Sequence, residues 1–143
     1  MIRVTRRYAF AASHRLHQPM LGDEENRRIY GKCNNPFGHG HNYVLYVSVA
    51  GEPDETTGMV VDPRKLDRVV ENIIVRAFDH RNLNQDAEEF AGGRTPPTTE
   101  CLAVAIRDRL LRIWPEAFPK GAPLLDRVNL EETGNNQFEL QCR

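Results

Sequence analysis

The sequence predicts an α+β protein in which two helices cover one face of an antiparallel sheet. Segments near the start, in the middle and at the end of the chain have the residue types and alternation of β-strands. Two segments between them repeat apolar residues at helical spacing. The length of 143 residues suits one domain with one core, and we expect that domain to span residues 1–143.

The first half of the chain contains three candidate strands. Residues 2–14 alternate with the period of a strand, and the even face that ends at His14 carries Ile2, Val4, Tyr8 and Phe10. Residues 42–51 are rich in β-branched and aromatic side chains. Residues 58–62, "GMVVD", form a short third candidate after the turn "EPDETTG".

The first predicted helix has a clear beginning. Asp62 is a good N-cap and Pro63 suits the first helical position. One face then carries Leu66, Val69, Val70, Ile73, Ile74, Ala77 and Phe78. This apolar pattern stops at "DHRNLN", where we expect the helix to end.

The second predicted helix follows "TPPTTE". Thr98 or Thr99 can cap it, Glu100 suits the positive end of its dipole, and Pro115 is expected to end it. The chain then closes with "LDRVNLEET", the turn "GNN" and "QFELQC", a pattern typical of a β-hairpin. Two helices leave one sheet face and both edges uncovered, and oligomerisation is one way to protect them.

Composition argues against several classes of protein. The formal net charge of −1 argues against a nucleic-acid-binding protein, which would be expected to carry an excess of basic residues. No apolar run approaches the roughly 18–20 residues needed to cross a bilayer. The first ten residues, "MIRVTRRYAF", lack the apolar core of a signal peptide, so we expect a cytoplasmic protein. In that reducing compartment Cys33, Cys101 and Cys142 are expected to be thiols.

The histidines suggest a metal site. His39 and His41 flank a glycine, and in an extended chain they point to the same side. His14 ends the even face of the first strand and would meet them if the two strands pair. Three histidines with a fourth position open is the pattern of catalytic zinc. The alternative is that they are ordinary surface or hydrogen-bonded histidines.

Other reactive side chains allow two interpretations each. Cys33 lies six residues before His39 and can be a nucleophile or base, or simply a small buried residue. Asp79 can orient His80, although a histidine also suits the end of a helix. Glu131 and Glu132 are consecutive on a strand and point to opposite faces, so one of them can be buried against a ligand with N–H donors.

Six motifs in order resemble the family of 6-pyruvoyltetrahydropterin and 6-carboxytetrahydropterin synthases. They are "FAASHRL", "DEENRRIYGKCNNPFGHGHNY", "GMVVD", "DHRNLN", "PTTE" and "EET", and the resemblance runs from Tyr8 to about Thr133. It implies a tunnelling-type fold, with an antiparallel four-stranded sheet and two helices on one face. It also implies a trimeric barrel that stacks into a hexamer, a dimer of trimers with active sites between subunits.

The resemblance also implies roles for individual residues. Zinc would be bound by His14, His39 and His41. Cys33 would be the catalytic thiol, joined in proton transfer by Asp79 and His80, which a neighbouring subunit would supply. Substrate-binding residues would be Glu132, Thr98, Thr99 and Glu100, with Glu132 as the anchor of the pterin and Glu131 a weaker candidate.

The implied activity is the zinc-dependent elimination of triphosphate from 7,8-dihydroneopterin triphosphate, which gives 6-pyruvoyltetrahydropterin on the route to tetrahydrobiopterin. A first alternative is the sister reaction of queuosine biosynthesis, which gives 6-carboxytetrahydropterin. The five-residue spacer "NNPFG" between Cys33 and His39 resembles the pyruvoyl type. A second alternative is a non-catalytic pterin-binding zinc protein. The chain ends in "LQCR", whereas the family is expected to end in Gly-Glu.

Overall fold

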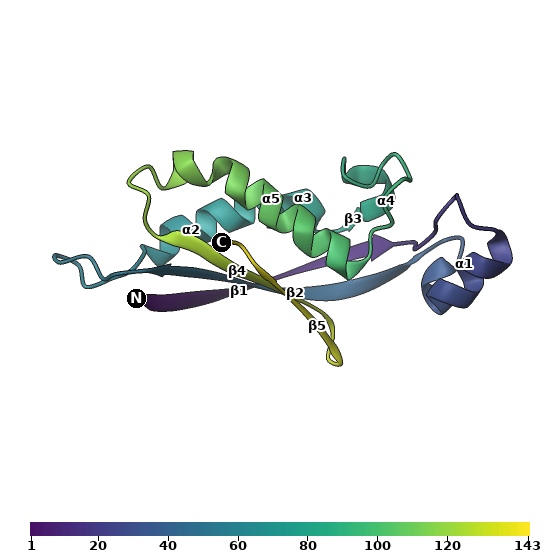
Figure 1. Ribbon diagram of the computed structural model, residues 1–143, viewed down its shortest axis with the longest axis horizontal. Coiled ribbons are helices and arrows are strands. Elements are labelled where there is room, and N and C mark those ends of the chain that lie inside the picture. Colours follow the sequence, from purple (N-terminus) through teal and green to yellow (C-terminus); the bar gives the residue numbers. More distant parts are fainter.

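The computed structural model describes residues 1–143 and has two layers, a long twisted sheet and a layer of helices on one of its faces (Figure 1). The sheet has five strands in the order β3-β1-β2-β4-β5. The strands are β1 (Ile2–His14), β2 (His39–Gly51), β3 (Arg81–Asn82), β4 (Leu124–Thr133) and β5 (Asn136–Gln141).

The helices fall into two groups. Those over the sheet are α2 (Pro63–Val70), α3 (Arg76–Phe78), α4 (Leu83–Asp86) and α5 (Thr99–Ala117), with a π-helical turn η2 (Glu71–Val75) joining α2 to α3. The others, α1 (Asp23–Tyr30) and the 3₁₀ turn η1 (Gly31–Asn34), lie beyond the end of the sheet where β1 stops and β2 starts (Figure 1). None of these helices combines the length and the apolar character needed to cross a bilayer.

The α+β class is confirmed, but three details of the predicted sheet are wrong. The sheet has five strands rather than four, and its edge strand β3 runs parallel to β1, with Ala12 opposite Arg81. The segment 58–62 is not a strand. It closes a loop instead, because Gly58 has a φ of +72° and the Asp54 amide donates to the Met59 carbonyl at 2.9 Å.

The central pair of strands positions the core. β1 and β2 pair without interruption from Ile2 opposite Gly51 to His14 opposite His39. β2 therefore starts three residues earlier than the predicted residue 42. Alternate residues face the helices and are buried there, including Tyr8, Phe10, Tyr43 and Leu45. They belong to one cluster of 25 buried hydrophobic residues.

The helix boundaries follow the expected capping chemistry, with one exception. The Asp62 carboxylate accepts from the Arg64 amide at 3.0 Å, and the Thr98 hydroxyl accepts from the Cys101 amide at 3.2 Å. Pro115 does not end α5, which continues to Ala117. A proline in the last turn removes only one helical hydrogen bond. Packing of Trp114 on Phe118, with ring centroids 4.6 Å apart, keeps that turn in place.

Candidate metal centre and active site

Three imidazoles converge at the end of the β1–β2 pair. His14 is the last residue of β1 and lies opposite His39, while His41 lies opposite Ala12. Paired residues point to the same face of a sheet, so all three rings lie on the side covered by helices. The Nε2 atoms of His14 and His39 are 3.2 Å apart, those of His14 and His41 are 3.2 Å apart, and those of His39 and His41 are 3.1 Å apart.

The protonation state of these rings suits a metal. His14 Nδ1 donates to the Pro97 carbonyl at 2.9 Å, so its Nε2 lone pair faces the other two rings. Burial lowers the pKa of His14 and of His41 below the ordinary value of 6.5. At neutral pH these two rings are therefore neutral, and neutral imidazole is the form that ligates metal ions.

The spacing of the nitrogens matches a tetrahedral ion. Ligands about 2.0–2.1 Å from a tetrahedral zinc lie about 3.3–3.4 Å from one another. The observed separations of 3.1–3.2 Å are close to this value. Lone pairs that face one another repel unless a proton or a cation lies between them, so the three histidines fit a divalent metal with an open fourth position.

Glu132 approaches the same cluster from β4. Its Oε1 lies 3.0 Å from His41 Nε2 and 4.0 Å from His14 Nε2. The β4–β5 register shifts between Glu131 and Thr133, and such an irregularity re-aims a side chain. The carboxylate can therefore ligate a metal or accept N–H donors from a molecule bound over the histidines. Glu131 pairs with Val44 and lies in neither group of candidate ligands.

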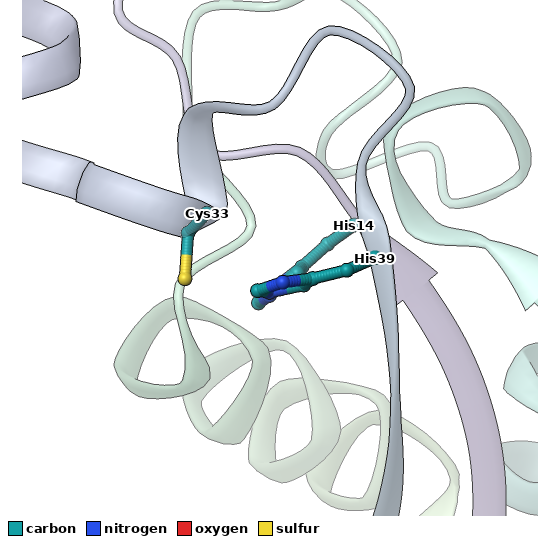
Figure 2. A group of neighbouring side chains, drawn as sticks. All are labelled: His14, Cys33 and His39. Atoms are coloured by element: carbon teal, nitrogen blue, oxygen red, sulfur yellow. The ribbon is translucent and has the colours of Figure 1, made fainter.

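Cys33 faces the histidines from a separate element, the η1 turn (Figure 2). Its Sγ and the nearest ring nitrogens of His14 and His39 all lie within 4.8 Å of one another. The turn is attached to the end of β1, because the Leu16 amide donates to the Cys33 carbonyl at 2.7 Å. Burial, and secondarily the charge of Glu132, raises the pKa of the thiol above its ordinary value of 9.0. The sulfur can thus reach either a metal or a molecule bound to it.

Asp79 and His80 form a second polar group at the outer edge of β1. Asp79 Oδ1 accepts from the Ala11 amide at 2.9 Å and lies 3.0 Å from His80 Nδ1. The Ala11 amide, and secondarily His80, holds the pKa of Asp79 below 3.8. His80 has a φ of +58°, and its amide donates to the Ala11 carbonyl at 2.6 Å.

Within one chain this pair is not brought to Cys33. The His80 side chain is 83% exposed and borders a hollow of about 510 Å³. The hollow lies at the β3 edge of the sheet, where it is bordered by Ala11, Ser13 and Asn42 of the uncovered face and also by His41. Cys33 does not border this hollow, and it lies instead beside His14 and His39.

The threonines and Glu100 occupy three different environments. The Thr98 hydroxyl caps α5. Thr99 is 2% exposed and its hydroxyl has no hydrogen-bond partner. Glu100 is exposed and borders a separate hollow of about 290 Å³ with Phe90 and Cys101.

Tyr43 is a candidate that the motifs did not suggest. Its side chain is fully buried, its hydroxyl has no hydrogen-bond partner, and its ring contacts that of His41 at a centroid distance of 5.7 Å. Burial raises the pKa of this phenol, the charge of Glu132 raises it further, the Thr99 hydroxyl lowers it and the charge of Cys33 raises it slightly, so all three residues lie nearby. The alternation that puts His39 and His41 on one face also puts Tyr43 there, and this signal was present in the sequence.

Comparisons with known proteins agree with this geometry. The model of the 6-pyruvoyl tetrahydropterin synthase family matches residues 3–142. A 6-pyruvoyl tetrahydrobiopterin synthase of Drosophila melanogaster is 46% identical over 134 residues, which are 93% of this chain and 75% of the relative. A 6-carboxy-5,6,7,8-tetrahydropterin synthase of Rickettsia typhi is 28% identical over 148 residues, covering 94% of this chain and 96% of the relative.

Among solved structures, that of Caenorhabditis elegans 6-pyruvoyl tetrahydropterin synthase superposes with a TM-score of 0.85 at 38% identity. The match covers 98% of this chain and 94% of that one. The family model and the relatives therefore agree with the resemblance seen in the motifs, and the chain belongs to the 6-pyruvoyl tetrahydropterin synthase family.

Proposed function

We propose that this protein is a zinc-dependent lyase, a 6-pyruvoyltetrahydropterin synthase that eliminates triphosphate from 7,8-dihydroneopterin triphosphate with internal redox tautomerisation. One observation carries the proposal. Three Nε2 atoms converge at 3.1–3.2 Å, and the Cys33 sulfur lies within 4.8 Å of two of these rings. This arrangement combines a site for a Lewis acid with a candidate base for C–H bonds.

In this proposal His14, His39 and His41 hold the zinc. When bound, the metal supplies Lewis acidity to the side-chain hydroxyls of the pterin and so acidifies the adjacent C–H bonds. The hydrogen bond from His14 Nδ1 to Pro97 orients that ligand and fixes its tautomer. Glu132 accepts the guanidine-like N–H edge of the pterin, and Thr99, Thr98 and Glu100 are the weaker candidates for contacts with substrate.

The residues of the chain then move the protons. Cys33 acts as the thiolate, a form that the charge of a bound zinc would favour although burial alone raises the pKa of the thiol, and it removes a proton from the substrate side chain. The electron pair of that C–H bond forms a C=C bond to the pterin ring as the nitrogen of the adjacent ring C=N bond takes up a proton. Triphosphate departs with the electrons of its C–O bond. Further proton shifts, in which Cys33 is joined by Asp79 and His80, reduce the ring and leave the side chain as a diketone. General acid–base groups typically contribute about 10²–10⁴-fold each.

The geometry of one chain motivates the proposal that a second subunit completes the site. Asp79 is bound to the Ala11 amide at the edge of β1 and His80 borders the hollow there, whereas Cys33 does not border that hollow. A neighbouring chain would bring its Asp79–His80 pair to this Cys33 in a trimeric barrel that stacks into a hexamer. A cytoplasmic setting suits the three cysteines, which are all free thiols.

Incubation of the zinc-loaded protein with 7,8-dihydroneopterin triphosphate tests the proposal. We expect the pyruvoyl product and inorganic triphosphate. A carboxy product with acetaldehyde would instead assign the chain to the sister reaction, and absence of triphosphate release would leave only the non-catalytic alternative. Loss of bound zinc is expected for His39→Ala. A stable monomer in sedimentation would contradict a site shared between subunits.

A further inference from the structure

A second polar hollow lies beside the candidate active site, between the end of β1 and the α1–η1 segment. It has a volume of about 330 Å³, and its lining contains no hydrophobic residue. Three of the lining residues are cations, namely Arg15, Arg27 and Lys32. Asp23 is the one acidic residue in the lining, so the hollow has an excess of two positive charges.

These cations are not neutralised by ion pairs. Arg15, Arg27 and Lys32 make no salt bridge with any carboxylate of the chain, and neither does Asp23. The neighbouring Arg28 differs, because it pairs with Glu25 on α1 and does not line the hollow. Unpaired cations gathered in a concave polar site are complementary to an anion.

Arg15 is held in place without using its charge. Its Nε donates to the Asn34 carbonyl at 3.2 Å, which leaves its terminal nitrogens free. The Asn84 side chain makes two hydrogen bonds with the backbone of Arg15. It accepts from the Arg15 amide at 2.7 Å and donates to the Arg15 carbonyl at 2.8 Å. A guanidinium fixed in this way loses little further freedom when it binds an oxyanion.

The hollow adjoins the reacting groups. Arg15 follows the ligand His14 directly, and Lys32 directly precedes Cys33, so each cation lies one residue, about 3.8 Å along the backbone, from a reacting group. The hydrogen bond from the Leu16 amide to the Cys33 carbonyl holds the two segments together. The hollow and the candidate site are therefore built on the same two backbone segments, and the charged tail of a substrate bound over the histidines would enter this hollow.

We propose that this hollow is the subsite for the triphosphate group, with Arg15, Arg27 and Lys32 binding its oxygens. The inference rests on the proposed function for the identity of the substrate. Arginine binds phosphate oxygens through a planar fork and lysine as a point charge. The same contacts hold the triphosphate as it departs, so the hollow binds inorganic triphosphate as well as the intact substrate.

Binding of inorganic triphosphate, measured by calorimetry on the full-length protein, tests the subsite directly. Arg27→Ala and Lys32→Ala remove exposed side chains that make no bond within the chain, so neither variant should disturb folding. Each is expected to weaken binding about tenfold or more. Each should also make the binding less dependent on salt concentration, because one cationic contact is lost. Arg28→Ala is the matched control on the same helix, and we expect it to bind like the unmodified protein.

Two further arms separate this inference from its alternatives. His39→Ala should retain triphosphate binding, and loss of binding in that variant would place the anion on the metal instead. Kinetics with the triphosphate substrate should show a raised KM for Arg27→Ala and Lys32→Ala. If turnover occurs and these variants match Arg28→Ala, the subsite is wrong although the proposed function stands. If triphosphate binds as expected but no turnover occurs, the proposed function fails and the subsite stands.

Discussion

Replacing Gly38 by alanine should damage the fold and the metal site together. Gly38 has a φ of +71°, and a Cβ built there would lie 2.6 Å from the His14 carbonyl oxygen and 3.1 Å from the carbonyl carbon. The left-handed conformation costs a non-glycine residue about 1–2 kcal/mol. Relief of the contact requires movement of backbone and adds an overpacking cost of about 1–3 kcal/mol. We therefore expect a total loss of about 2–5 kcal/mol.

Urea denaturation at a fixed protein concentration measures this loss. With a slope of about 2 kcal/mol per molar urea, the midpoint should fall by about 1–2.5 M. Because the displaced backbone carries His14, zinc affinity should fall as well. Two control variants separate the causes. Gly58→Ala has the same positive φ, +72°, with open space around it, whereas the Cβ of Gly40→Ala makes only an ordinary 3.8 Å contact with the Ala12 carbonyl oxygen.

We expect Gly58→Ala to lose only the conformational share and Gly40→Ala to change stability little. A loss for Gly38→Ala within about 0.5 kcal/mol of that for Gly58→Ala would refute the argument from the backbone contact. Unchanged zinc affinity in Gly38→Ala would refute the link between this turn and the ligand geometry.

Three further predictions concern single side chains. Cys33→Ala should lower turnover about 10²–10⁴-fold with zinc content unchanged, and parallel loss of zinc in metal analysis would make the thiol a ligand. Tyr43→Phe removes a buried hydroxyl without a partner, so thermal unfolding should show a stability that is unchanged or higher by up to about 1 kcal/mol. The KM for substrate should rise. A loss of stability would contradict the prediction. Arg109 holds the pKa of Glu89 below 4.5 through hydrogen bonds of 2.7 and 2.6 Å. This pair stabilises the fold fully above pH 4.5, and its contribution is lost as pH falls through the lowered pKa of Glu89. Glu89→Gln should therefore flatten the acid side of a plot of unfolding free energy against pH. An unchanged plot would count against the pair.

The sequence predicted the elements whose side chains repeat with a clear period. The alternation in β1 and the apolar stripe of the helix that starts at Pro63 each place one face of the element in the core. Both elements were predicted correctly because their burial is periodic. The start of β2 was missed by three residues because "HGH" has no β-branched side chain. Pairing with β1, rather than intrinsic propensity, makes His39 part of the strand.

Two elements had no periodic signal. β3 consists of Arg81 and Asn82, and only its contact with β1 defines it as a strand. The helix α1 has no apolar stripe. Its fully buried residue is Asn26, whose amide donates to the carbonyls of Gln18, Leu21 and Gly22. A helix held by one buried polar side chain cannot be recognised from hydrophobic periodicity.

The candidate site was predictable where strand alternation decides it. The H-x-H spacing and the parity of His14 indicated three rings on one face, and the structure brings these rings together. The closeness of Glu132 to His41 was not predictable, because it depends on the order of the strands and on an irregularity in β4. The placement of Asp79 and His80 away from Cys33 depends on the docking of β3 against the edge of β1, which the residue pattern does not reveal.

The regularity of the strands explains how this site can hold its three histidines in a fixed geometry and still leave a position for substrate. His14, His39 and His41 lie on a strand pair that keeps one register over its whole length. A slip of one residue would turn every ring to the other face, so the packed core below them also fixes the metal geometry. Glu132 instead lies where the β4 register shifts, and this irregularity rather than strand alternation aims its carboxylate at the rings. The open position that the proposed zinc would offer to substrate is therefore next to Glu132, whose Oε1 lies 3.0 Å from His41 Nε2.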